Sequence, residues 1–213
     1  MTLTQALLVS DDIMKDILSL AAFVCNMPTT YPRGSGKLLK AENISCHIYK
    51  KLELLRKYLK NISYCTLSYA DSHTAEQLLQ SIDELTLITE HLTHIARVSK
   101  TISRLKSPLS FAAQRELVEL WSRIDVILKT LEDAFLKSNS ITGMWMFRQN
   151  SIIQEQIKDL KKNHIKRLRN GTCCIETGIC FLDLLYDHEQ IAMHCTTLFH
   201  EEFIMDHYEE RKG

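Results

Sequence analysis

The sequence has few residues that break helices, no excess of either charge and no long apolar run. Its 213 residues include 6 glycines and 3 prolines, which favours few and long elements. Acidic and basic residues number 26 each, whereas a nucleic-acid binder usually carries a basic excess. The most apolar stretch, residues 18–27, is about half of the ~20 residues that a membrane span needs. We therefore expect no nucleic-acid partner and no membrane insertion by this chain.

Motifs for disulfide frameworks, secretion and catalysis are also missing. The seven cysteines are odd in number and form no C-x-x-C pair, which is typical of free thiols in a reducing compartment. No basic region precedes the first apolar segment, as it would in a signal peptide. There is no glycine-rich phosphate loop and no G-x-S-x-G nucleophile motif. These observations predict a cytoplasmic protein that is not an enzyme.

Apolar residues recur at spacings of three and four along six segments, which is the pattern of amphipathic helices. The predicted helices span about residues 4–26, 37–67, 72–105, 108–137, 144–170 and 172–207. Several residues mark the expected helix boundaries. The first helix should end at Pro28, the third should be N-capped at Asp71 or Ser72 and the fourth at Ser107. A turn is expected over residues 138–143, and Gly171 should end the fifth helix. Gly178 is expected inside the last helix at a modest cost. No segment alternates with period two, so no strand is predicted.

An internal repeat indicates the architecture. Residues 84–91 (ELTLITEH) and 187–194 (DHEQIAMH) carry an acid, an isoleucine and a histidine at matching places, 103 residues apart. Each copy follows a long lysine-rich helix, which in turn follows an amphipathic one. The sequence therefore predicts an all-α chain of two tandem three-helix bundles, six long helices related by internal duplication. The first bundle is expected over residues 1–106 and the second over 107–213.

The segment from Asp187 to Cys195 resembles the signature of the PhoU family, approximately D-L-E-R-I-G-D-H-A. Residues 164–173 and 178–185 are similar to the run that precedes this signature in the PhoU-like C-terminal domain of bacterial sodium/phosphate (Na/Pi) cotransporters. Residues 82–96 occupy the equivalent place in the first half. The resemblance covers about residues 13–203 and implies two three-helix bundles side by side.

The PhoU family carries E/D-x-x-x-D pairs, whose acids share one helix face and can bind Mg²⁺, Mn²⁺ or iron. At the matching positions Glu155 and Asp159 form a full pair, and Glu189 remains with Met193 in place of its second acid. The first bundle keeps half pairs, Glu53 beside Tyr49 and Glu90 beside Thr86. The resemblance thus implies a degenerate metal site of Glu155, Asp159 and Glu189, with no cofactor or at most one weakly bound divalent ion. Alternatively, these are solvated helix acids near Lys158, Lys161 and Lys162.

Two further features allow two interpretations each. His91 and His194 lie at the signature histidine of each repeat and are either metal or switch residues or buried structural imidazoles. The lysine-rich runs 50–57 and 158–169 either bind an acidic partner or lipid headgroups or are solvated helix faces.

The resemblance implies a regulatory module of inorganic phosphate uptake. It would dock to a membrane phosphate transporter of the Na/Pi cotransporter type or to its signalling partners, at the inner face of the membrane, and could self-associate without them. The alternative is a generic helical scaffold with a decayed metal site and no phosphate role, and a metal-binding enzyme or storage protein comes third. The sequence leaves open whether the chain is free-standing or a detached C-terminal part of a cotransporter.

Overall fold

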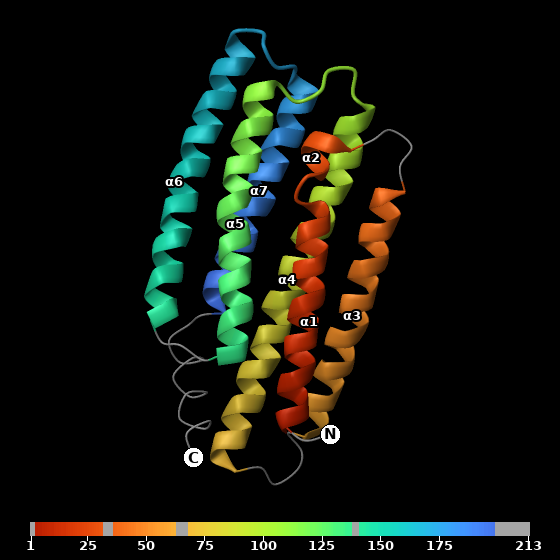
Figure 1. Ribbon diagram of the computed structural model, residues 1–213, viewed down its shortest axis with the longest axis vertical. Helices are drawn as coiled ribbons and strands as arrows, with labels where there is room; N and C mark the ends of the chain where they lie inside the picture. The colour runs from red at the N-terminus through yellow and green to blue at the C-terminus, as the bar shows by residue number, and fades with distance from the viewer. Residues whose placement is uncertain (1–2, 32–35, 63–67, 138–140, 199–213) are drawn as a thin grey trace.

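The computed structural model describes residues 3–31, 36–62, 68–137 and 141–198, and helices make up nearly all of this part of the chain, with no strand in it (Figure 1). The long helices are α1 (Leu3–Val24), α3 (Lys37–Ile62), α4 (Tyr69–Arg104), α5 (Phe111–Lys137), α6 (Ile141–Arg169) and α7 (Ile175–Thr197). A one-turn helix, α2 (Met27–Thr30), follows α1. The all-α prediction with six long helices is confirmed. None of the described helices is both long and apolar enough to span a membrane.

The helices form two three-helix units, α1–α3–α4 and α5–α6–α7, arranged in two layers. Helices α3, α4, α7 and α6 lie side by side in that order, while α1 and α5 contact each other and cover α4 and α7 (Figure 1). The most extensive helix–helix contact is the one between α4 and α7, the third helix of each unit. Two tandem bundles therefore meet along their third helices.

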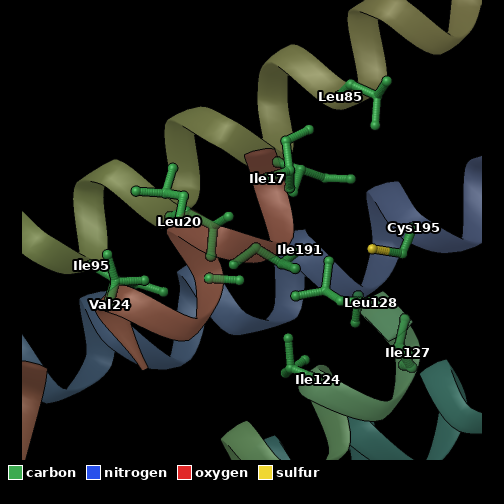
Figure 2. Packing of buried hydrophobic residues seen from close by; sticks show 14 of the residues in the cluster. Ile17, Leu20, Val24, Leu85, Ile95, Ile124, Ile127, Leu128, Ile191 and Cys195 are labelled. Atoms are coloured by element: carbon green, nitrogen blue, oxygen red, sulfur yellow. The ribbon is translucent and has the colours of Figure 1, made fainter. Parts of the chain in front are cut away.

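The apolar core is continuous from one bundle to the other. Figure 2 shows side chains of α1, α4, α5 and α7 converging where the bundles meet, among them Leu20, Ile95, Leu128 and Ile191. Each of these four is fully buried, and burying such a side chain contributes about 1.5–3 kcal/mol. The predicted boundary between residues 106 and 107 lies in the connection between α4 and α5, but the core crosses from unit to unit.

Two predicted N-caps are wrong by about one helical turn. Helix α4 is capped by Ser68, whose Oγ accepts the Asp71 backbone N–H at 3.1 Å, so Asp71 lies in the first turn. Helix α5 begins at Phe111, and Ser110 Oγ accepts the Ala113 N–H at 3.3 Å. The expected cap Ser107 instead uses its backbone carbonyl to accept the Thr177 hydroxyl from α7, at 2.6 Å. Ser107 thus lies outside α5 and takes part in a contact between the bundles.

Other predicted boundaries also differ. Helix α1 ends at Val24, and Pro28 lies in the first turn of α2, where a missing N–H costs no hydrogen bond. Helix α6 begins at Ile141, inside the segment predicted as a turn. Residues 32–35, 63–67, 138–140 and 199–213 lie outside the described residues, and with them the predicted ends of the second and sixth helices.

Gly171 ends α6 as predicted. Its φ of 67° is left-handed, its N–H donates to the Leu168 carbonyl at 3.1 Å, and the Thr172 N–H donates to the Arg167 carbonyl at 3.0 Å. These two bonds are the Schellman motif, which satisfies carbonyls left open at the helix end. The chain can therefore turn sharply into α7.

Gly178 has a packing role that the sequence did not indicate. A Cβ at this position would come within 2.7 Å of His164 Cε1 and 2.8 Å of its Nε2. The His164 side chain is buried, with its ring centroid 5.3 Å from that of Phe181. Burial and the nearby Arg167 charge lower the pKa of His164, so the ring is neutral at neutral pH. Gly178 thus allows α6 and α7 to approach around this imidazole.

We expect Gly178→Ala to lower the free energy of unfolding by about 1–3 kcal/mol, because the added methyl group overpacks against His164. Helix propensity alone predicts the opposite, a gain of about 1 kcal/mol. Urea unfolding of the full chain measures the difference. In a His164→Ala background the same glycine substitution should cost less. A Gly178→Ala protein as stable as the parent would contradict this account of the packing.

Candidate functional site

Carboxylates and histidines gather where α4 meets α7. The interbundle cluster consists of Glu84, His91 and His94 from α4 and of Asp187 and His194 from α7. The Asp187 side chain is 1% exposed, and its two oxygens lie 2.9 Å from His91 Nδ1 and 2.7 Å from His94 Nδ1. Because an ionised carboxylate can only accept, each imidazole donates its Nδ1–H.

The contacts are reciprocal between the repeats. His194 Nδ1 donates to Glu84 Oε2 at 2.7 Å, while His91 donates to Asp187. The rings of His91 and His194 stack, with centroids 5.6 Å apart and planes at 22°. Each bundle therefore supplies a carboxylate to the signature histidine of the other, as expected of two copies related by a pseudo-two-fold axis.

The two halves of the cluster differ by one histidine. Asp187 accepts from two imidazoles, but Glu84, whose side chain is 22% exposed, accepts from His194. The residue 103 positions after His94 is Thr197, whose hydroxyl donates to the Met193 carbonyl at 3.2 Å. The more deeply buried carboxylate thus has the larger set of donors. This is the arrangement that a buried charge requires, since removal from water costs several kcal/mol unless hydrogen bonds replace it.

His188 lies beside the cluster and is buried. Its Nδ1 bonds to the Leu184 carbonyl, and its ring meets the Trp121 ring edge-on with centroids 5.4 Å apart. Burial lowers the pKa of His188, which keeps it neutral at neutral pH. Across the described part of the chain, no group of three or more His, Cys, Asp or Glu side chains is arranged to hold a metal ion. The geometry favours the interpretation of His91 and His194 as structural imidazoles paired with carboxylates.

The predicted metal ligands lie outside this cluster. Glu155 and Asp159 are exposed on α6, and Lys162 Nζ donates to Asp159 at 2.9 Å, which lowers the pKa of that carboxyl. Glu189 on α7 pairs instead with Lys161, at 3.3 Å. Lysines are therefore the partners that the structure describes for two of the three acids, and the metal site stays a prediction.

An exposed apolar row on α7 was not anticipated from the sequence. Its side chains are 37–71% exposed, and we call the row the α7 stripe: Ile175, Ile179, Leu182, Tyr186 and Met193. The spacings of four, three, four and seven residues place them on one helix face. Tyr186 meets the His91 ring edge-on, with centroids 5.9 Å apart, so the stripe adjoins the interbundle cluster. Large contiguous patches of exposed apolar side chains are typical of surfaces that bind a partner.

No protein-family model matches the sequence, and no curated protein matches it significantly. Among solved structures, PhoU from Pseudomonas aeruginosa is similar with a TM-score of 0.82 and 13% identity, over 99% of this chain and 96% of that one. The phosphate transport system regulatory protein PhoU from Streptococcus pneumoniae is similar with a TM-score of 0.78 and 13% identity, over 99% and 94% of the two chains. The chain therefore has the fold of PhoU along its whole length.

We expect Asp187→Ala to cost more stability than Glu84→Ala. The first change removes a carboxylate that is 1% exposed and leaves two imidazole donors, His91 and His94, without this acceptor, at about 2–4 kcal/mol. The second removes a carboxylate that is 22% exposed and leaves one donor, His194, at about 1 kcal/mol. Chemical denaturation at pH 7.5 measures both. Glu119→Ala, which removes an exposed ion pair with Arg115, is the control and should change little. Equal losses of stability in Asp187→Ala and Glu84→Ala would contradict the proposed difference between the two carboxylates.

Proposed function

We propose that this chain is a PhoU-like regulatory module of inorganic phosphate uptake that acts by docking and not by catalysis. Its partner would be a membrane phosphate transporter of the Na/Pi cotransporter type or that transporter's signalling partner. The observation that carries the proposal is the α7 stripe, an exposed apolar row in the middle of the four-helix layer of a PhoU fold. The similarity to a phosphate transport system regulatory protein along nearly the whole chain supports the phosphate role.

The chemistry of the surface beside the stripe suggests what a partner must offer. Helix α6 packs against α7, and its Ile165 is 49% exposed. Helix α6 also carries exposed basic side chains, Lys158, Lys166 and Arg169, whereas its Lys161 and Lys162 already pair with Glu189 and Asp159. A partner helix with one apolar face and acidic residues along its edge would bury the stripe and pair with these cations.

The proposed location is the cytoplasm, at the inner face of the membrane when the module is docked. Self-association through the same stripe would cover it when the transporter is absent. The alternative function is a helical scaffold with no phosphate role, and the identity of the captured partners separates the two. A scaffold would recover partners unrelated to phosphate transport and would not respond to phosphate supply.

We further propose that Glu155, Asp159 and Glu189 hold at most one divalent ion, weakly. The ion would have to displace Lys162 from Asp159 and Lys161 from Glu189 before it could bind both carboxylates. Water would supply most of the six or so oxygens that a hard cation needs.

The docking proposal predicts that Ile179→Glu weakens capture of the transporter. A charge in the α7 stripe should reduce recovery of membrane phosphate transport components about tenfold or more, because it removes apolar contact at the centre of the surface. Pull-downs with the tagged full chain from phosphate-replete and phosphate-starved cells provide the measurement. Val126→Glu on α5, in the other layer, changes a valine that is 49% exposed, against 56% for Ile179, and should have no effect. Recovery of no transport component under either condition would argue against docking.

The metal proposal predicts less than one ion per chain after dialysis against metal-free buffer, as measured by elemental analysis. Any ion present should be lost in Asp159→Ala, and the helical content should be unchanged because Asp159 is exposed and the neighbouring Ile157 and Leu160 remain buried. Two or more tightly retained iron, manganese or zinc ions would mean that other residues are the ligands.

A further inference from the structure

One end of the molecule carries an excess of positive charge, although the chain as a whole has no net charge. Residues 97–115 contain five basic side chains, residues 160–175 contain another five, and neither segment contains an acidic one. The first segment includes the end of α4 and the start of α5, and the second includes the end of α6 and the start of α7. All four of these helix ends lie at the same end of the bundles (Figure 1). The topology thus gathers basic residues that are far apart in the sequence.

A hydrogen bond joins the α4–α5 connection to the start of α7 at this end. The Thr177 hydroxyl donates to the Ser107 carbonyl at 2.6 Å, and Ser107 follows Lys106 directly. Arg169 and Ile175 line one open hollow beside the same turn. We call this surface the basic end, and its exposed cations are Arg104, Lys106, Lys166 and Arg169.

The four exposed cations of the basic end differ from most other basic side chains in their partners. None of the four forms an ion pair with another described residue. In the other lysine-rich run, on α3, Lys51 pairs with Asp12 and Asp16, each at 2.6 Å, and Arg56 pairs with Asp83 at 2.6 Å. Two runs that look alike in the sequence are therefore different in the structure, because acids neutralise much of the run on α3.

Neighbouring acids offset little of the charge at the basic end. Glu116, the first acid after residue 115, pairs with Arg167 at 2.8 Å, and both side chains are largely buried. Glu176 is exposed in the first turn of α7 and offsets one positive charge. The basic end thus stays positive, and a partner that complements it must be anionic.

Exposed apolar side chains stand among these cations. Phe111, the first residue of α5, is 80% exposed, and Ile175, the first residue of α7, is 71% exposed. The two come from different helices, so they do not form the continuous row that a partner helix would cover. A nucleic-acid duplex offers mainly phosphates to such a surface, whereas an anionic bilayer offers phosphates together with an apolar layer just beneath them.

We propose that the basic end binds the surface of an anionic phospholipid bilayer. The guanidinium and ammonium groups pair with the headgroup phosphates, and Phe111 and Ile175 enter the boundary between headgroups and acyl chains. The α7 stripe runs away from this end along α7 after Ile175, so its later residues stay open to a protein partner. This inference is independent of the proposed phosphate role, because lipid binding requires no transporter.

The test measures co-sedimentation of the reduced full chain with vesicles of phosphatidylglycerol and phosphatidylcholine in equal parts. We expect binding to these vesicles, none to pure phosphatidylcholine, and loss of binding between about 0.1 and about 1 M salt, where the screening length falls from ~10 to ~3 Å. Arg104→Gln combined with Lys106→Gln should lower the partition coefficient about 25-fold, at about fivefold per cation. Lys50→Gln combined with Lys60→Gln removes the same charge from exposed positions on α3, away from the basic end, and should change binding less than about twofold.

Phe111 supplies the second measurement. Phe111→Ser should weaken vesicle binding about fivefold or more, because the ring no longer enters the bilayer. Tyr69→Ser is the matched control, since Tyr69 is an aromatic residue, 89% exposed, that begins α4 at the opposite end of the molecule (Figure 1). It should leave binding unchanged, and circular dichroism establishes that each variant is folded.

Three results would overturn the proposal: no binding to the anionic vesicles, equal binding to neutral vesicles, or equal losses in the two double variants. Binding of an oligonucleotide or of polyglutamate as tight as that of vesicles, together with unchanged vesicle binding by Phe111→Ser, would assign the basic end to a soluble polyanion instead of a bilayer.

Discussion

The molecule is organised by one buried charge, the carboxylate of Asp187, which lies almost out of reach of solvent at the contact of α4 with α7. A carboxylate in that position needs donors, and both that the structure provides, His91 and His94, come from the other bundle. A shift of α7 by a single residue would turn the carboxylate by about 100° and leave it unpaired. The polar cluster therefore helps, together with the apolar contacts, to fix the register of α4 against α7.

Sequence patterns predicted the helices well because most of their buried stripes are long and regularly spaced. The ends were harder to predict, since both Ser107 and Ser110 can cap a helix. Helix α5 begins at Phe111, later than predicted, and the Ser107 carbonyl before it accepts the hydroxyl of Thr177, a residue distant in sequence. Gly178 is a similar case, because helix propensity contains no information on a His164 ring from a neighbouring helix.

The repeat identified four of the five residues of the interbundle cluster, but it could not indicate that each acid binds the histidine of the other copy. His94 was missed because Thr197 occupies its place in the second copy. The α7 stripe was missed for a different reason. Helix α7 is apolar on its buried sides and on its exposed one, so its residues do not separate into an apolar and a polar face. Which apolar residues face solvent depends on where α4, α5 and α6 pack.

The reciprocal pairing of Glu84 with His194 and of Asp187 with His91 has a consequence for the ancestry of the chain. If one gene segment was duplicated, a symmetric pair of separate copies could have made the same contacts before fusion. After fusion the copies diverged, and the second histidine now belongs to one copy alone. Each half of the present chain, taken alone, would expose an apolar helix face together with a charge or an imidazole whose counterpart is encoded in the other half. Recombination that exchanged a single half between relatives would therefore have to preserve this pairing.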